Sequence, residues 1–191
     1  MTVFDTSRTE TTYSVGRVAL TDIPDKRLRK LAGYWYSRRT GHALPSRDDV
    51  DPIDLPNGVL PNMILLDIVG SARYRRFRFR LVGTAIYTHV GRELTGLHID
   101  EALPEPYLSY VSFTHTTAAD QRLPVYSETL YHDQGNFVNG ITYRLVLPLA
   151  SDGETADMIM VSQFWIRRGE KSGWEGNWRT VQPLTQIVEP G

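Results

Sequence analysis

The residues from Arg76 to Gly83 constrain the fold most strongly, because they alternate strictly between charged and apolar side chains before the pattern changes. In a half-buried strand every second side chain faces the core. Phe77, Phe79 and Leu81 are therefore predicted to face inward, and the arginines between them to face water. The run predicts a strand over residues 76–83 with one solvated face.

The apolar period changes immediately after this strand. Ile86, Tyr87 and Val90 recur at helical spacing, and glycines at positions 83, 91 and 96 mark the ends of short elements. We therefore expect the sheet to give way at Gly83 to helices that cover one of its faces. Helical segments are expected from residue 84 to residue 121, with breaks at the glycines and at Pro104.

Composition restricts the class of protein. The chain has 191 residues, of which 23% are charged and 41% hydrophobic, and its net charge is -1. These values are typical of one soluble domain, and a dedicated nucleic-acid partner is not expected because such proteins are usually basic. Cysteine is absent, which excludes disulfides, thiolate metal sites, cysteine nucleophiles and flavin adducts formed on a cysteine.

The N-terminal residues 1–20 are polar and rich in Thr and Ser, and they are expected to form a flexible arm. They lack the basic and apolar regions of a secretory signal, and no apolar run approaches the length of a membrane span. We therefore expect a cytoplasmic protein with no membrane partner.

An amphipathic helix is predicted over residues 24–38. Leu28, Leu31, Ala32 and Trp35 fall on one face at the i, i+3, i+4, i+7 spacing, and basic residues cover the other face. This stripe can pack on the sheet of its own chain or on the sheet of a second copy. Homodimerisation is the preferred use, with Leu28, Leu31 and Trp35 as candidate interface residues.

The remaining strands are predicted at residues 60–69, 124–132, 140–150 and 156–167, with turn residues between the last three. Two strands, a helical crossover and three further strands predict an α+β fold, in which helices cover one face of a five-stranded antiparallel sheet. We expect a domain over residues 21–168 that includes the N-terminal helix, and a peripheral tail over residues 169–191 containing Trp174 and Trp178.

Two motifs resemble a known family. Leu-Pro-Ser-Arg-Asp-Asp-Val-Asp-Pro at positions 44–52, preceded by Trp35 in a helix, resembles the opening motif of a PAS-domain family common in alphaproteobacteria. The run at positions 77–84, followed by Gly-Arg-Glu-Leu-Thr-Gly at positions 91–96, resembles its second signature. The resemblance implies a PAS fold and a sensory or protein-interaction role rather than catalysis. It identifies no ligand, cofactor or catalytic residue.

Large side chains are predicted to converge between the sheet and the helices, where they would either line a small-molecule pocket or simply fill the core. The candidates are Phe79, Tyr87, Tyr107, Tyr110, Val111, His115, Tyr143 and Phe164. His115 lies in the long predicted helix, from which PAS proteins that bind haem supply an axial ligand. A hydrogen-bonded histidine without haem is the simpler interpretation.

The arginines at positions 73, 75, 76, 78 and 80 have two interpretations. They form a phosphate or nucleic-acid site, or they form the solvated face of a sheet and pair with Asp67 or Glu128 on neighbouring strands. The second interpretation is preferred, although an anionic small molecule near Arg80 and Arg92 remains an alternative. No group of residues has the spacing of a metal site, a nucleophile elbow or a phosphate loop, so no enzymatic activity is expected.

Three functions therefore remain open. The first is a sensory module that binds a small ligand between sheet and helices and signals to a separate protein. The second is a ligand-free module for protein interaction and dimerisation, and the third is a haem sensor. The cofactor, the ligand and the partner are not identified by the sequence.

Overall fold

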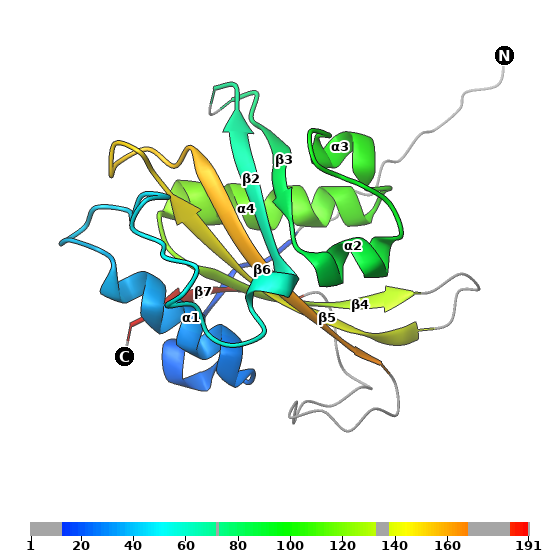
Figure 1. The fold of residues 1–191 in the computed structure, drawn as a ribbon, viewed down its shortest axis with the longest axis horizontal. Helices are drawn as coiled ribbons and strands as arrows, with labels where there is room; N and C mark the ends of the chain where they lie inside the picture. The colour runs from blue at the N-terminus through cyan, green and yellow to red at the C-terminus, as the bar shows by residue number, and fades with distance from the viewer. Residues whose placement is uncertain (1–12, 72, 133–137, 168–183, 191) are drawn as a thin grey trace, which may run out of the picture.

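The computed structural model describes residues 13–71, 73–132, 138–167 and 184–190 (Figure 1). Its strands are β1 (Gly16–Ala19), β2 (Met63–Val69), β3 (Arg76–Val82), β4 (Val125–His132), β5 (Val138–Leu149), β6 (Met158–Arg167) and β7 (Leu184–Glu189). Its α-helices are α1 (Lys26–Ser37), α2 (Thr84–Val90), α3 (Ile99–Ala102) and α4 (Tyr107–Gln121), and short 3₁₀ helices lie at Leu20–Asp22 and Leu60–Asn62.

The described strands form one mixed sheet in the order β1-β7-β4-β5-β6-β2-β3. Its antiparallel part from β4 to β3 contains the five strands predicted from the sequence, which confirms the expected fold class. β7 adds to β4 in antiparallel orientation, and β1 pairs with β7 in parallel. The sequence pattern did not predict these two strands. Residues 1–12 of the expected arm and most of the expected tail, with Trp174 and Trp178, lie outside the described residues.

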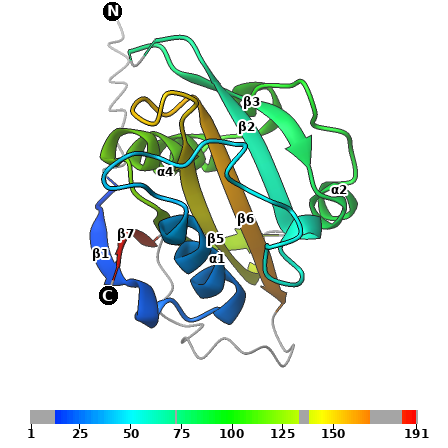
Figure 2. The same cartoon turned by 60° about the vertical axis from the view of Figure 1, so that its left-hand side comes forward.

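Helices cover both faces of the sheet. α2, α3 and α4 lie on one face and α1 lies on the other, as the two ribbon views show (Figures 1 and 2). Consecutive residues of β5 therefore face different layers. The hydroxyl of Tyr143 contacts α1, and the guanidinium of Arg144 contacts the first residue of α4. Below, the face that carries α4 is called the inner face, and the face that carries α1 is called the outer face.

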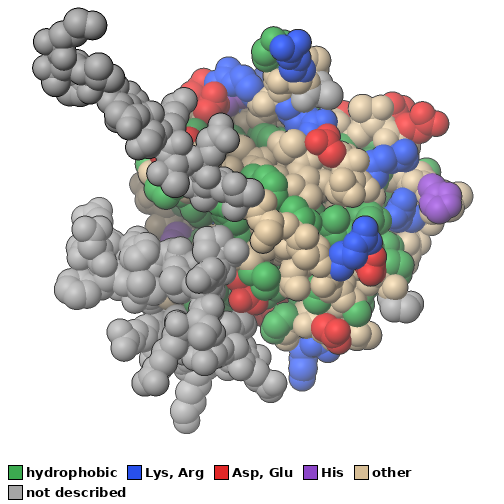
Figure 3. Space-filling view, turned by 180° about the vertical axis from the view of Figure 1, so that it is seen from behind, with side chains coloured by type: hydrophobic (Ala, Val, Ile, Leu, Met, Phe, Trp, Pro, Cys, Tyr) green, Lys and Arg blue, Asp and Glu red, His purple; other side chains and the backbone are tan. Residues whose placement is uncertain are grey.

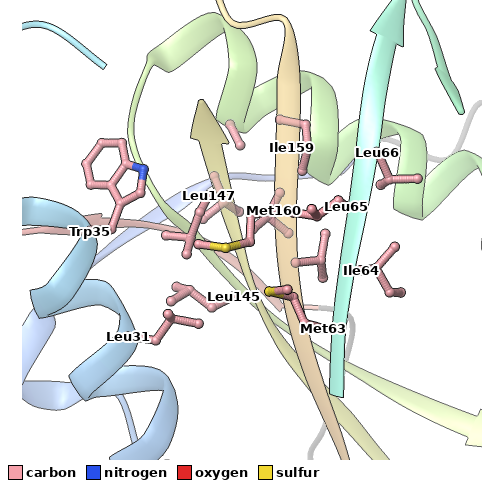
Figure 4. Close-up of a cluster of buried hydrophobic side chains, with 14 of the residues drawn as sticks. Leu31, Trp35, Met63, Ile64, Leu65, Leu66, Leu145, Leu147, Ile159 and Met160 are labelled. Carbon is pink, nitrogen blue, oxygen red and sulfur yellow. The ribbon is translucent and has the colours of Figure 1, made fainter. Parts of the chain in front are cut away.

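The apolar stripe of α1 is buried against the chain's own sheet. Leu28, Leu31, Ala32 and Trp35 are at most 1% exposed, and the indole Nε1 of Trp35 donates to the carbonyl of Pro148 at 2.9 Å. Figure 4 shows Leu31 and Trp35 beside side chains from β5 and β6. Of the two uses that the sequence left open for this stripe, the structure shows packing within one chain.

Polar contacts fix the start of α1 to the sheet. The carboxylate of Asp25 caps the helix by accepting from the backbone N–H groups of Arg27 and Leu28 at 2.8 and 3.1 Å. The Arg27 guanidinium lies 3.5 Å from the centre of the Phe164 ring and donates to the Tyr143 hydroxyl at 3.1 Å. These contacts orient the helix across β5 and β6.

The alternation in β3 is interrupted by a bulge. Phe77 and Phe79 are buried as predicted, but Leu81 is 40% exposed, so the prediction that it faces the core was wrong. The pairing of β2 with β3 shifts between Leu65 and Leu66, so that Leu65 lies opposite Leu81 and Leu66 lies opposite Phe79. The extra residue in β3 turns Leu81 to the outer face.

At Gly83, where the apolar pattern of the sequence changes from strand to helix spacing, the backbone passes close to the backbone of residues 60–63. Gly83 is the N-cap of α2, and its N–H donates to the carbonyl of Met63 at 2.7 Å. A Cβ at this position would collide with the carbonyl oxygens of Leu60 and Pro61. The chain can therefore pass from β3 into α2 here only with a glycine.

The packing of α1 gives a direct stability prediction. Replacing Trp35 by Ala is expected to lower the free energy of unfolding by about 3–5 kcal/mol, because it leaves a cavity and removes the hydrogen bond to Pro148. Lys30→Ala, at an exposed position on the same helix, should change it by less than about 0.5 kcal/mol. Urea unfolding measures both variants, and equal effects would contradict the role of α1 as a core layer.

Candidate functional site

Arg144 is the most unusual residue of the inner face. It lies in the middle of β5 and is 1% exposed, with Ser127 of β4 and Gln163 of β6 as its neighbours in register. Because both faces of β5 are covered by helices, its side chain cannot extend to water. Arginine stays protonated in proteins, so this position carries a buried positive charge.

One nitrogen of this guanidinium is well bonded. Nη2 of Arg144 donates to the hydroxyl of Tyr107 at 2.8 Å and to Oγ1 of Thr129 at 3.2 Å. Its Cζ lies 5.3 Å from the centre of the Tyr107 ring, within range of a cation–π contact. The side chain thus connects the middle of the sheet to the first residue of α4.

The other nitrogens have no acceptor. Nε and Nη1 of Arg144 are buried and make no hydrogen bond to any described residue, and neither does Oγ of Ser127 beside it. The adjacent acid, Glu128, points to the outer face, where its Oε1 accepts from the Tyr126 hydroxyl at 2.5 Å. A buried charge without a counter-charge costs on the order of several kcal/mol, and such groups call for an explanation.

His115 lies on the same side of the sheet and is neutral. Burial and, to a smaller extent, the charge of Arg144 lower the pKa of His115 to about 3, although a hydrogen bond to Val111 opposes the shift. Nδ1 of His115 lies 2.7 Å from the carbonyl oxygen of Val111, so this nitrogen carries the proton. The ring also packs edge-on against Phe77 at 5.3 Å between centres. Among the described residues that are buried on the inner face, Arg144 is the one that carries a charge.

Tyr110 attaches the inner face to β7. Its hydroxyl donates to the carbonyl of Leu184 at 2.7 Å and accepts from Oγ1 of Thr185 at 3.2 Å, and burial raises the pKa of this phenol. Tyr110 is thus a structural contact between α4 and the strand that extends the sheet.

Five of the predicted pocket residues lie on the inner face. They are Phe79, Tyr107, Tyr110, Val111 and His115, and all except the partly exposed Tyr107 are buried. Tyr87 is 48% exposed on α2. Tyr143 and Phe164 stack on each other on the outer face, beneath Arg27. The structure thus corrects the placement of Tyr143 and Phe164 between the sheet and α4, because their register in β5 and β6 gives them the opposite face.

Sequence reasoning did not identify Arg144. It lies in Ile-Thr-Tyr-Arg-Leu-Val-Leu, where the surrounding apolar residues predict a strand without showing which faces are buried. A lone arginine between Tyr143 and Leu145, within the strand predicted over residues 140–150, was the available signal.

The arginines around β3 form ion pairs. Asp67 of β2 accepts from Arg78 at 2.9 Å and from Arg80 at 3.3 Å, as predicted for a solvated sheet face. Arg76 pairs with Asp100 and Glu101, and Arg75 pairs with Asp120. Seen from the α4 side, acidic and basic side chains are interspersed among apolar ones (Figure 3). These contacts support the structural interpretation of the arginines over a phosphate site.

The first of the two signature motifs has a structural role. In Leu44–Pro52, the N–H of Leu44 donates to Gly153 at 2.7 Å, and the carboxylate of Asp49 accepts from Ser46. The second motif pairs with the β3 edge, where Gly96 donates to the carbonyl of Phe79 at 2.7 Å. Both motifs thus fix connections around the sheet and place no reactive group in the inner face.

An open groove of about 410 Å³ lies at the other end of α4, against the β1–β7 edge of the sheet. Its lining includes Arg17, Phe113, Thr117, Asp120 and Ile187, and it contains none of the predicted pocket residues.

The described residues contain no cluster of three His, Asp or Glu side chains that could hold a metal ion. None of their helices combines the length and the apolar character that crossing a membrane requires.

Comparison with known proteins identifies the family. Residues 24–162 match a family model described as a PAS domain, and this match covers more than half of the chain. The chain therefore belongs to the PAS domain family. A fungal LOV domain photoreceptor of known structure is similar at 13% sequence identity with a TM-score of 0.43, over 77% of this chain and 96% of that chain. A search among curated proteins found no match.

The buried imidazole predicts a pH dependence. The unfolded chain protonates His115 below about pH 6.5, whereas the folded chain keeps it neutral down to about pH 3. Its contribution to stability is therefore complete above pH 6.5 and declines below that pH, by at most about 1.4 kcal/mol per pH unit.

Urea unfolding at several pH values between about 6.5 and 5 measures this decline. His115→Gln should remove it, and His42→Gln, at an exposed position, should retain it. Equal pH slopes in the wild type and in His115→Gln would contradict a buried neutral imidazole.

Proposed function

We propose that this PAS module is a sensor that binds a small molecule between the inner face of the sheet and α4. The supporting observation is the group of unsatisfied polar atoms on the inner face, formed by Nε and Nη1 of Arg144 and Oγ of Ser127. A core that served packing alone would place apolar side chains here, because unpaired polar atoms lower stability. A ligand that accepts from these donors satisfies them.

The binding position suggests how occupancy is transmitted. Arg144 contacts Tyr107 at the start of α4, and Tyr110 one turn later contacts β7. A ligand that binds one arrangement of these side chains better than another shifts the position of α4 relative to the sheet edge. The signal then passes to a separate protein through this altered surface, and the module itself catalyses no reaction.

Homodimerisation remains a prediction and takes a changed form. Because Leu28, Leu31 and Trp35 are buried on the chain's own sheet, a dimer that uses these side chains requires two chains to exchange their α1 helices.

The ligand-free interaction module and the haem sensor remain the competing functions. Haem would have to bind His115 through Nε2, since Nδ1 faces Val111.

Mass spectrometry of freshly purified protein tests the proposal. Under native conditions we expect a mass above that of the polypeptide, and after denaturation we expect the polypeptide mass with a released small molecule. The extracted molecule, added back to dialysed protein, should raise the midpoint of thermal unfolding. A polypeptide that carries no small molecule and whose midpoint no extract raises would contradict ligand sensing, and a Soret band would favour the haem alternative.

A further inference from the structure

We propose that the ligand of this module is a small organic monocarboxylate, and that Arg144 is its charge partner. This inference rests on the proposed function and specifies the chemistry of the same site. It starts from the two nitrogens of Arg144 that lack acceptors in a side chain that is 1% exposed.

The charge of the ligand follows from the charges around the site. Arg144 is positive, and no carboxylate among the described residues accepts from it. His115 is neutral, and Glu128 faces the other side of the sheet. One negative charge therefore balances the site. A monocarboxylate supplies that charge, whereas a phosphate monoester brings more negative charge than the described residues can balance.

The hydrogen-bonding pattern also favours an acceptor. The unsatisfied nitrogens are donors only, and carboxylate oxygens are the acceptors that arginine binds most strongly in proteins. The unpaired Oγ of Ser127, on the adjacent strand and the same face, can donate to the same group. Arginine and serine together thus present donors from β5 and β4 to one carboxylate.

The rest of the ligand is expected to be apolar. Val146, two residues along β5 on the same face as Arg144, and Val111, one turn along α4 from Tyr107, are buried and would provide aliphatic contacts. Small-molecule sites typically combine such a lining with a few polar groups that fix orientation. A carboxylate attached to a compact aromatic or aliphatic body fits this combination.

Tyr107 connects this site to α4. Its hydroxyl accepts from Nη2 of Arg144, so a carboxylate that repositions the guanidinium also repositions the first residue of the helix. Ligand binding is therefore coupled to α4 through a contact present in the structure.

The test uses purified, dialysed protein and two probe anions, benzoate and octanoate. Each is compared with its uncharged amide, benzamide or octanamide, and with chloride. We expect the carboxylates to raise the midpoint of thermal unfolding, and the amides and chloride to leave it unchanged. Equal effects of amide and carboxylate, or of chloride and carboxylate, would overturn the proposal, the latter indicating an adventitious ion only.

Variants assign the effect to this site. Arg144→Met should weaken benzoate binding by about a hundredfold or more, as expected when one partner of a buried charged contact is removed. Arg78→Met, which removes an exposed arginine on the outer face, should retain wild-type binding. In the absence of carboxylate, Arg144→Met should unfold at the wild-type midpoint or above it, because it removes an unpaired charge.

A second variant keeps the charge in place. Ser127→Ala removes the neighbouring unpaired hydroxyl and should weaken benzoate binding several-fold without lowering stability. Wild-type binding in both Arg144→Met and Ser127→Ala would overturn the assignment. A neutral molecule found in the purified protein, with no response to either carboxylate, would overturn this inference and leave the proposed function intact. No bound molecule and no response to any probe would overturn both.

Discussion

The structure depends on a central strand that is buried on both faces. Residues 141–150, which include most of β5, are buried throughout, with α1 over one face and α4 over the other. A strand in this position has no solvated side, so every polar side chain in it must find a partner inside the protein. Tyr143 finds one in Arg27 of α1. Arg144, on the opposite face, is satisfied only at Nη2.

The two faces of the sheet differ in how their polar side chains are satisfied. On the outer face, the stripe of α1 and the contacts of Asp25, Arg27 and Tyr143 form a packed layer, in which the hydroxyl of Ser162 also has no partner among the described residues. On the inner face, the donors of Arg144 and Ser127 remain open. The family resemblance and the matched family model agree on a PAS domain, but neither identifies a ligand. The proposed ligand chemistry therefore comes from side chains that the family signatures do not include.

Much of the fold could be predicted from local sequence patterns, whereas long-range pairing could not. The stripe of α1 and the alternation at Phe77 and Phe79 identify their elements directly, because burial repeats with the period of the backbone. β1 and β7 are short, and their partners lie far away in the chain, so no local pattern shows that they pair. Likewise, the sheet faces on which Tyr143 and Phe164 lie depend on strand register, which the local sequence does not show. The charge balance around Arg144 depends on the face to which Glu128 points, and this too is set by register.

In the proposed site, Arg144 carries an unpaired charge that an organic anion neutralises. A high-resolution crystal structure of the protein with benzoate tests it most directly. We expect density for the carboxylate within hydrogen-bond distance of Nη1 or Nε of Arg144, with the benzoate ring packed between the sheet and α4. A guanidinium of Arg144 paired with an aspartate or glutamate of the same chain, or benzoate bound elsewhere, would rule out this charge pairing.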